Sequence, residues 1–266
     1  YTDRRLDTIP LLSISMTLLL AGLLGFFDDV LGWKKGISPA KRVLLTMPLS
    51  LPLVVVKAGT SIIELPIIGL LDLGVLYPLL VVPIGVIGAS NAFNMIAGYN
   101  GLEATQALII LTFSSILAYI RSQYDAVAII LPIAVSILVF YSLYNKYPAR
   151  AFPGNSFTYG IGALYASLAI YWNFEKYAVM TFTLYFIELA LFIRGLINKV
   201  YKENFGKVQS DGSLLPPYDK SYSVTHIAIK IVNKIKGKCY EQDVVRVIAL
   251  LQSLICLVSL CLVITM

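Results

Sequence analysis

The chain alternates between long apolar runs and short polar connections. Eight of the runs approach the length of a membrane-spanning helix, which needs about twenty mostly apolar residues. Several runs contain proline, which membrane helices tolerate where neighbouring groups bond the carbonyls that it frees. The pattern therefore predicts an all-α polytopic membrane protein with eight transmembrane helices, at residues 10–27, 43–57, 74–90, 103–120, 126–143, 156–173, 177–195 and 244–265.

Two segments between the apolar runs do not fit a span. Residues 58–73 hold short apolar stretches interrupted by Gly and Pro, which predicts a small external hairpin. Residues 196–243 form a polar, basic loop. Within this loop, residues 227–238 (IAIKIVNKIKGK) have the spacing of an amphipathic helix that could lie on the membrane surface.

The basic residues orient the spans. When the connection after the first span is placed in the cytoplasm, cytoplasmic segments hold 16 of the 21 Lys and Arg residues. This asymmetry follows the positive-inside rule, and it makes the 196–243 loop cytoplasmic. Because Tyr1 is not an initiator Met, we expect the sequence to begin inside a longer protein.

Composition and charge narrow the function classes. The chain is 58% hydrophobic and 14% charged, whereas about a quarter of the residues in soluble proteins are charged. Its net charge of +6 suits anionic lipid and an anionic substrate. We expect no nucleic-acid partner, since no basic module stands apart from the spans. The sequence also shows no internal repeat, which argues against a transporter built from paired halves.

Polar motifs gather on the predicted cytoplasmic face, and the first of them is an acidic pair. Asp28 and Asp29 end the first span, where carboxylates oppose the helix dipole and need a compensating cation. Two carboxylates beside a hard cation favour phosphate chemistry. A solvated helix end is the alternative interpretation.

The second motif joins the third and fourth spans. It contains Asn91, Asn94 and Asn100, whose amides can bind Mg²⁺, a base or a phosphate. Gly98 and Gly101 allow positive φ and close approach of a ligand to the backbone. An ordinary turn is the alternative.

The third motif, at residues 152–156, is a tight turn followed by a helix start. It predicts Ser156 as N-cap, Phe152 as a base-stacking aromatic and Asn155 as a metal ligand, with a plain turn as the alternative. Glu188 lies in the middle of a span, so it is either functional or a hydrogen-bonded packing residue. His226, the only histidine, is expected to be structural.

Three stretches in this order, GFFDDVLGW, NAFNMIAGYNGLEA and FPGNSFTYGIGA, resemble the polyprenyl-phosphate N-acetylhexosamine-1-phosphate transferase superfamily. The run Ala-Gly-Tyr-Asn-Gly-Leu-Glu resembles its archaeal and eukaryotic branch, the dolichyl-phosphate N-acetylglucosamine-phosphotransferases. The resemblance implies one transmembrane transferase domain over residues 1–266. It also implies ten spans in the whole protein, so that the first two are missing from this sequence.

The resemblance also implies a reaction. N-acetylhexosamine-1-phosphate, with GlcNAc as the expected sugar, passes from a UDP-sugar to polyprenyl or dolichyl phosphate, and UMP leaves. The implied cofactor is Mg²⁺ or Mn²⁺, direct displacement is favoured, and a homodimer stays open. The implied location is the cytoplasmic face of an archaeal plasma membrane, favoured over the endoplasmic reticulum. The alternatives are a bacterial-type undecaprenyl-phosphate sugar-phosphate transferase and, from another class, an anion transporter.

Carried over position by position, the resemblance assigns roles to twelve residues. The catalytic residues are Asp28, Asp29 and Lys41. The metal ligands are Asn94 and Asn155. The substrate-binding residues are Trp33, Arg42 (which competes with Lys41 for one basic position), Asn91, Gly98, Asn100, Phe152 and Lys207.

One departure from the family pattern concerns the metal. The family usually has Asp at the position of Asn155, and an amide there removes one negative charge from the metal site. The change is either a lineage variant or the mark of a non-catalytic relative. The last loop also lacks the His-rich signature of other branches, which leaves the choice of sugar less defined.

Overall fold

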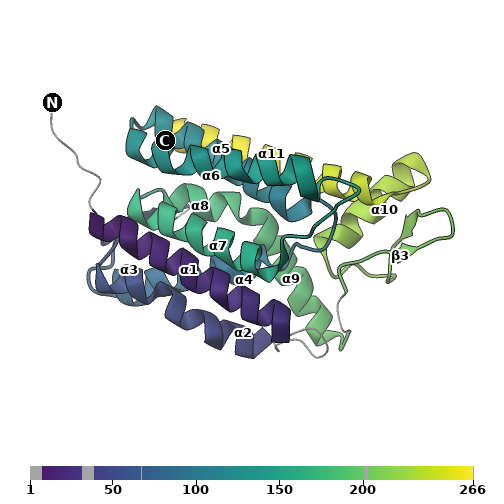
Figure 1. Ribbon diagram of the computed structural model, residues 1–266, viewed down its shortest axis with the longest axis horizontal. Coiled ribbons are helices and arrows are strands. Elements are labelled where there is room, and N and C mark those ends of the chain that lie inside the picture. Colours follow the sequence, from purple (N-terminus) through teal and green to yellow (C-terminus); the bar gives the residue numbers. More distant parts are fainter. Residues whose placement is uncertain (1–7, 32–38, 67, 201–202, 266) are drawn as a thin grey trace. The chain divides into compact units, whose positions relative to one another are not determined.

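A computed structural model describes residues 8–31, 39–66, 68–200 and 203–265 of the 266-residue chain. The chain is predominantly helical (Figure 1). The α-helices are α1 (Thr8–Leu31), α2 (Pro39–Thr46), α3 (Leu51–Val55), α4 (Val82–Phe93), α5 (Leu102–Ile120), α6 (Tyr124–Phe140), α7 (Gly154–Tyr171), α8 (Glu175–Thr181), α9 (Thr183–Ile197), α10 (Val224–Lys236) and α11 (Glu241–Thr265). Shorter helical turns are η1 (Met47–Ser50), η2 (Tyr77–Val81) and η3 (Tyr141–Asn145), and the strands are β1 (Ile62–Leu65), β2 (Gly69–Asp72), β3 (Lys207–Val208) and β4 (Leu214–Leu215).

The eight predicted spans fall mainly on helical residues, but the helices differ in length. Four are long and apolar enough to cross a membrane by themselves: α1, α5, α6 continued by η3, and α11. A fifth is added if α8 and α9 form one broken span. The prediction of a membrane protein is therefore confirmed, whereas the number of eight spans stays a prediction. At 43–57, Pro48 and Pro52 lie at the starts of η1 and α3 and separate them from α2, because proline cannot donate a backbone hydrogen bond.

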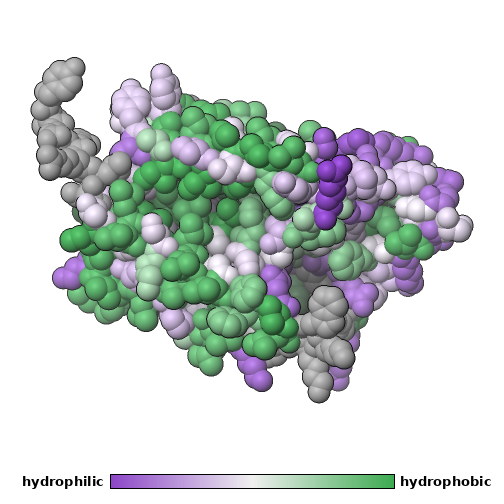
Figure 2. Space-filling model, in the orientation of Figure 1, coloured by the Kyte–Doolittle hydropathy of each residue, from purple (hydrophilic) through white to green (hydrophobic). Residues whose placement is uncertain are grey.

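The surface agrees with a lipid environment. Hydrophobic residues cover much of the visible face in Figure 2. On α1 the exposed side chains are apolar over several turns, and they include Leu12, Met16, Leu19, Leu23 and Phe26. A helix that exposes such residues in water would lose roughly 25 cal/mol for each Å² of apolar surface left unburied.

The described residues form two compact units. The first consists of the described residues within 1–94, 115–129 and 153–180, and the second of those within 95–114, 130–152 and 181–266. In the first unit, α7 packs against both α1 and α4. Its residues from Thr158 to Ile170 are all buried, so the helix forms the core of that unit.

Glycines let these helices approach closely. A Cβ built on Gly25 of α1 would lie 2.3 Å from the carbonyl oxygen of Asn155 at the start of α7. A Cβ on Gly162 of α7 would lie 2.3 Å from the carbonyl oxygen of Ala89 in α4. Small residues at such contacts are the usual means by which membrane helices bring their backbones together.

The two-stranded sheets are small. In the first unit β1 and β2 pair antiparallel, with Ile62 opposite Asp72 and Leu65 opposite Gly69. They lie within the range where the sequence predicts a hairpin, and its position outside the membrane stays a prediction. In the second unit β3 and β4 pair antiparallel, and α10 contacts α9, α11 and β4. The amphipathic helix expected at 227–238 is thus present as α10.

Candidate active site

The acidic pair lies at the end of α1 against the start of α7. Asp29 is exposed, and its carboxylate accepts hydrogen bonds from the backbone N–H of Asn155 at 2.9 and 3.0 Å and of Ser156 at 3.4 Å. These N–H groups belong to the first turn of α7, where no helical carbonyl is available to them. Asp29 therefore caps α7 from another helix. Its negative charge lies at the positive N-terminal end of the α7 dipole, where it is stabilising.

This arrangement corrects one sequence-based prediction. Ser156 is not the N-cap of α7, because the helix begins at Gly154 after Pro153 and Ser156 lies within its first turn. The sequence showed a turn followed by a helix, but it could not show that a carboxylate from α1 would bond the first N–H groups. Gly154 has φ +68, and a Cβ there would lie 2.5 Å from Asp29 Oδ2, so a residue without a side chain is needed.

Asp28 is buried, with 2% of its surface exposed. Its Oδ2 accepts hydrogen bonds from Asn155 Nδ2 at 3.0 Å and from the Tyr159 hydroxyl at 3.1 Å, and Arg42 Nε lies 3.4 Å away. Its Oδ1 is also buried, yet it has no hydrogen-bond partner among the residues that the structure describes. A buried carboxylate oxygen without a partner is costly unless a ligand or an ion satisfies it.

Asn94 follows the last residue of α4 and contacts the start of α7, where Asn155 lies. Thr158 Oγ1 donates to Asn94 Oδ1 at 2.9 Å, and it also lies 3.2 Å from the carbonyl oxygen of Asn155. The structure thus brings together Asp28, Asp29, Asn94 and Asn155, as the motifs predicted. Tyr159 was not assigned a role from the sequence. Its signal was its spacing, since it follows Asn155 by four residues and so lies on the same face of α7.

The other predicted residues of the first unit differ in their contacts. Arg42 makes the ion pair with Asp28, whereas Lys41 is exposed and makes no side-chain hydrogen bond or ion pair with any described residue. Asn91 Nδ2 donates to Thr46 Oγ1 at 2.9 Å and to the Ile87 carbonyl at 2.8 Å, which ties α4 to α2. Trp33 lies outside the described residues.

The donor set has the chemistry of a hard-cation site. Among the described residues, no cluster of three or more His, Cys, Asp and Glu side chains could hold a metal ion. Asp28 Oδ1, however, is a buried carboxylate oxygen that has no hydrogen-bond partner among the described residues. Asn155 reaches Asp28 Oδ2 through Nδ2, and Thr158 Oγ1 bonds Asn94 Oδ1 and lies near the Asn155 carbonyl. Carboxylate and amide oxygens together suit Mg²⁺, which is usually held by one or two carboxylates and completes its shell with water and substrate.

In the second unit, residues 95–101 form a loop fastened by side chains from distant segments. Asn204 Nδ2 donates to the carbonyls of Met95 at 3.1 Å and Ala97 at 3.3 Å. The Tyr99 hydroxyl donates to the Asn204 carbonyl at 3.1 Å. Burial raises the pKa of Tyr99 to about 12, so the hydroxyl keeps the proton that it donates.

Gly98 and Asn100 of this loop were predicted to bind nucleotide. Gly98 has φ +106, and Phe205 packs so closely that a Cβ would lie 2.8 Å from its ring. Asn100 uses both ends of its amide, because Nδ2 donates to Glu241 and Oδ1 accepts from Ala149 N–H at 2.6 Å. Both residues therefore hold the loop in shape in this structure, and their contact with a nucleotide stays a prediction.

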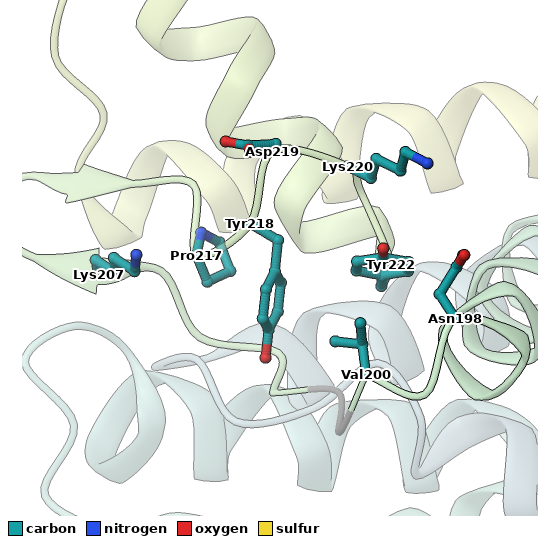
Figure 3. A pocket seen from close by; sticks show the side chains of 8 residues that line it. All are labelled: Asn198, Val200, Lys207, Pro217, Tyr218, Asp219, Lys220 and Tyr222. Carbon is teal, nitrogen blue, oxygen red and sulfur yellow. The ribbon is translucent and has the colours of Figure 1, made fainter.

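A cavity of about 540 Å³ lies in the second unit (Figure 3). Lys207 and Lys220 supply two positive charges, and the rings of Tyr218 and Tyr222 supply apolar surface. The other lining residues are Asn198, Val200, Pro217 and Asp219. Lys207 thus lies at an open, basic cavity, as a residue that contacts a phosphate would. Phe152 is 55% exposed, which leaves its ring accessible.

Glu188 and His226 have structural roles in the second unit. Glu188 is fully buried, and its carboxylate accepts hydrogen bonds from Ser223 Oγ at 3.0 Å and from Val224 N–H at 2.7 Å. It therefore bonds the first N–H group of α10 and holds the N-cap residue Ser223, as Asp29 bonds N–H groups in the first turn of α7. His226 is also fully buried; Nδ1 accepts from Tyr222 N–H at 3.2 Å, and Nε2 lies 2.7 Å from the Glu203 carbonyl. The packing interpretation of Glu188 is thus favoured over that of a substrate site in a transporter.

Comparisons with known proteins agree with the three motifs. Residues 11–173 match the model of the family described as Glycosyl transferase family 4. A Saccharolobus solfataricus protein that bears the name UDP-N-acetylglucosamine–dolichyl-phosphate N-acetylglucosaminephosphotransferase is 35% identical over 250 residues, which cover 92% of this chain and 72% of the relative.

Two more distant relatives extend the comparison. A Dictyostelium discoideum protein of the same name is 30% identical over 207 residues, covering 64% of this chain and 47% of that protein. A phospho-N-acetylmuramoyl-pentapeptide-transferase of Streptococcus mutans is 33% identical over 187 residues, covering 67% of this chain and 54% of that protein.

Proposed function

This chain belongs to glycosyl transferase family 4, and from that premise we propose that it transfers GlcNAc-1-phosphate from UDP-GlcNAc to dolichyl or polyprenyl phosphate. The protein is an integral-membrane phosphotransferase. The observation that carries the proposal is the acidic pair seated on the first turn of α7, with Asp28 Oδ1 buried and unbonded among the described residues. We place this pair at the cytoplasmic face, as the distribution of basic residues favours.

In the proposed reaction, an oxygen of the lipid phosphate attacks the β-phosphorus of UDP-GlcNAc. The new P–O bond forms as the bond to the oxygen bridging the α-phosphate breaks, and UMP leaves with that oxygen. The second pKa of a phosphoester is about 6, so the attacking group is largely ionised near neutral pH. Asp28 accepts any remaining proton or orients the attacking group, and we favour direct displacement over a covalent intermediate.

The neighbours of Asp28 fix its side chain for this role. Asn155, Tyr159 and Arg42 all bind Oδ2, which leaves Oδ1 as the reactive or metal-binding oxygen. Asp28, Asn155 and Asn94 are the residues that would hold Mg²⁺ or Mn²⁺. When bound, the ion would offset negative charge on the diphosphate. Residues around the metal fix its ligands, so Asp29 supports the site by fastening Asn155 to α1.

The choice of lipid acceptor rests on the branch of the family. The archaeal relative that bears the dolichyl-phosphate name matches 92% of the chain, whereas the bacterial pentapeptide-transferase matches 67%. Dolichyl phosphate is therefore the proposed acceptor, and undecaprenyl phosphate is the alternative. In this role the enzyme begins the lipid-linked oligosaccharide used in protein N-glycosylation. A homodimer also stays a proposal.

The function is tested with the complete protein in detergent. Radiolabelled UDP-GlcNAc is supplied with dolichyl phosphate or undecaprenyl phosphate, with Mg²⁺, with Mn²⁺ or with chelator, and the lipid product is identified by mass. We expect a GlcNAc-diphospholipid, made faster with dolichyl phosphate and only with a divalent cation. UDP-glucose, which lacks the N-acetyl group, is the matched control donor. Absence of a lipid-linked product with every cation and acceptor would contradict the proposal.

Replacing Asn155 with Asp is expected to strengthen Mg²⁺ binding. The new carboxylate would lie where Asn155 Nδ2 now donates, 3.0 Å from Asp28 Oδ2, and two negative charges so close repel unless a cation joins them. Without divalent cation the N155D protein should unfold at a lower temperature than the parent. Mg²⁺ should then raise its midpoint more than the parent's, since a ligand at a hundredfold excess over its Kd stabilises by about 2.7 kcal/mol.

The matched control for this prediction is Asn173→Asp. It makes the same substitution in the same unit, beyond the other end of α7, where Asn173 is exposed and accepts a hydrogen bond from Thr60. N173D should respond to Mg²⁺ as the parent does. An equal Mg²⁺ response in N155D and the parent would remove Asn155 from the metal site, without deciding whether the protein transfers GlcNAc-1-phosphate.

A further inference from the structure

α10 buries one face within its own unit and exposes the other. Ile231 is 41% exposed and Ile235 is 77% exposed. Ile227, which is partly buried, precedes them at the same interval of four residues, so the three side chains form one stripe along the helix. The buried side of the helix consists of Val224, Thr225, His226, Ala228, Ile229 and Val232.

Lysines border this stripe. Lys230 and Lys234 each follow an isoleucine of the stripe by three residues, which places them on the same side of the helix. Lys230 Nζ is bonded to the Asp219 carbonyl at 2.5 Å, and Lys234 is exposed. Figure 2 shows hydrophilic surface around α10 and β3 with hydrophobic patches within it. Apolar stripes edged by lysine are typical of helices that lie in the membrane interface.

The position of α10 in the chain brings this face near a bilayer. α10 ends at Lys236, and α11 begins at Glu241 and is long and apolar enough to cross a membrane. The two helices contact each other, and Lys236 Nζ lies 2.7 Å from Asp243 Oδ1 in the first turn of α11. The exposed face of α10 is therefore tied to the end of a candidate span, where lipid headgroups lie.

The geometry points to the Ile227–Ile231–Ile235 face of α10, with Lys230 and Lys234, as a docking surface for an anionic lipid bilayer. The isoleucines enter the boundary between headgroups and acyl chains. The lysine stems follow them, and the ammonium groups reach lipid phosphates. This inference does not depend on the proposed transfer reaction.

The test measures lipid contact in the complete protein. It is placed in nanodiscs of phosphatidylcholine, with or without phosphatidylglycerol, whose acyl chains carry bromine as a fluorescence quencher. A fluorophore is attached to Ile235→Cys in a Cys261→Ser background, because Cys261 is exposed whereas Cys239 and Cys256 are buried. We expect strong quenching that increases with phosphatidylglycerol. Ile231→Cys, labelled in the same way, is a second probe should the first variant fold poorly.

Two labelled references set the scale. Leu250 on α11 is 70% exposed, so a label on Leu250→Cys reports full lipid contact. Ser210 is exposed between β3 and β4, so a label on Ser210→Cys reports contact with water.

Lys230→Gln combined with Lys234→Gln should weaken the preference for the anionic surface by roughly fivefold per lysine. Lys146→Gln, which removes an exposed lysine of the same unit, should leave quenching at residue 235 unchanged.

Two results would overturn the inference. Quenching at residue 235 equal to that at residue 210 in both lipid mixtures would place the face in water. Protection of the fluorophore from both brominated lipid and aqueous iodide would show that protein covers it instead.

Discussion

Replacing Asp28 with Asn is expected to slow GlcNAc-1-phosphate transfer at least about a hundredfold, the lower bound for losing an acid–base group. The amide oxygen can still accept the hydrogen bonds of Asn155 and Tyr159 that Oδ2 receives now. The amide nitrogen would then replace Oδ1, so a donor would stand where a buried acceptor is now unbonded. The charge that faces Arg42 would also be lost. The measurement is the initial rate of lipid product at saturating substrates.

The control separates chemistry from folding. Glu64→Gln removes a half-exposed carboxylate of the same unit that pairs with the more buried Lys176, and the amide oxygen can still accept the hydrogen bond from the ammonium group. Its rate should match that of the parent. The thermal midpoint of D28N should stay close to the parent's, since the hydrogen bonds to Oδ2 survive. A rate within threefold of the parent, roughly 0.6 kcal/mol in the barrier, would remove Asp28 from the mechanism.

Replacing Gly25 with Ala is expected to damage both stability and activity. The added methyl would lie 2.3 Å from the Asn155 carbonyl oxygen and 2.4 Å from Ser156 Cα, which are backbone atoms that cannot rotate away. α1 and α7 must separate, and overpacking of this kind costs about 1–3 kcal/mol. Asp28 lies less than one turn along α1, so its carboxylate would shift as well. A misplacement of about 1 Å can cost about a hundredfold in rate.

Gly22→Ala is the matched control, on the same helix and with the same added methyl. Apart from its chain neighbours and the nearby backbone of α1, no described atom lies within 4 Å of the position that this methyl would take. Alanine favours a helix over glycine by about 0.5–1 kcal/mol, so G22A should be as stable as the parent or slightly more so. Thermal midpoints in detergent and transfer rates are compared for the two variants. If G25A and G22A behaved alike, the close contact of α1 with the start of α7 would not be what positions the acidic pair.

Two carboxylates that lie at helix starts, Asp29 and Glu188, show why residue type alone did not assign roles. Asp29 and Glu188 both bond the first N–H groups of a helix, α7 and α10 respectively. In the sequence, one was a catalytic candidate and the other an intramembrane carboxylate with two interpretations. Both carboxylates take these positions for the same reason. The first N–H groups of a helix have no carbonyl partner within the helix, and they attract any carboxylate that packing brings within reach.

The loop at 95–101 gives the opposite lesson. Its Asn100 and two glycines were interpreted as ligand-binding groups, and in the structure Asn100 fastens the loop to neighbouring segments while Gly98 makes room for Phe205. Asn100 bonds Glu241 and Ala149, and Asn204, more than a hundred residues away, holds Met95 and Ala97. No local pattern marks Asn204 for this role, because its partners are carbonyl groups that every residue carries.

The sequence by itself determined most of the segments that are helical, that two carboxylates lie near the end of α1, and that an amphipathic helix precedes the last apolar run. These features follow from the periodicity and local composition of short segments, which neighbouring residues decide. Only the tertiary structure decided that Asp29 caps α7, that Tyr159 and Arg42 share Asp28 Oδ2, and that Gly25 must lack a side chain. Those facts depend on which distant segments pack together and on how closely they pack, to within a few tenths of an ångström. A hydrophobic pattern specifies neither.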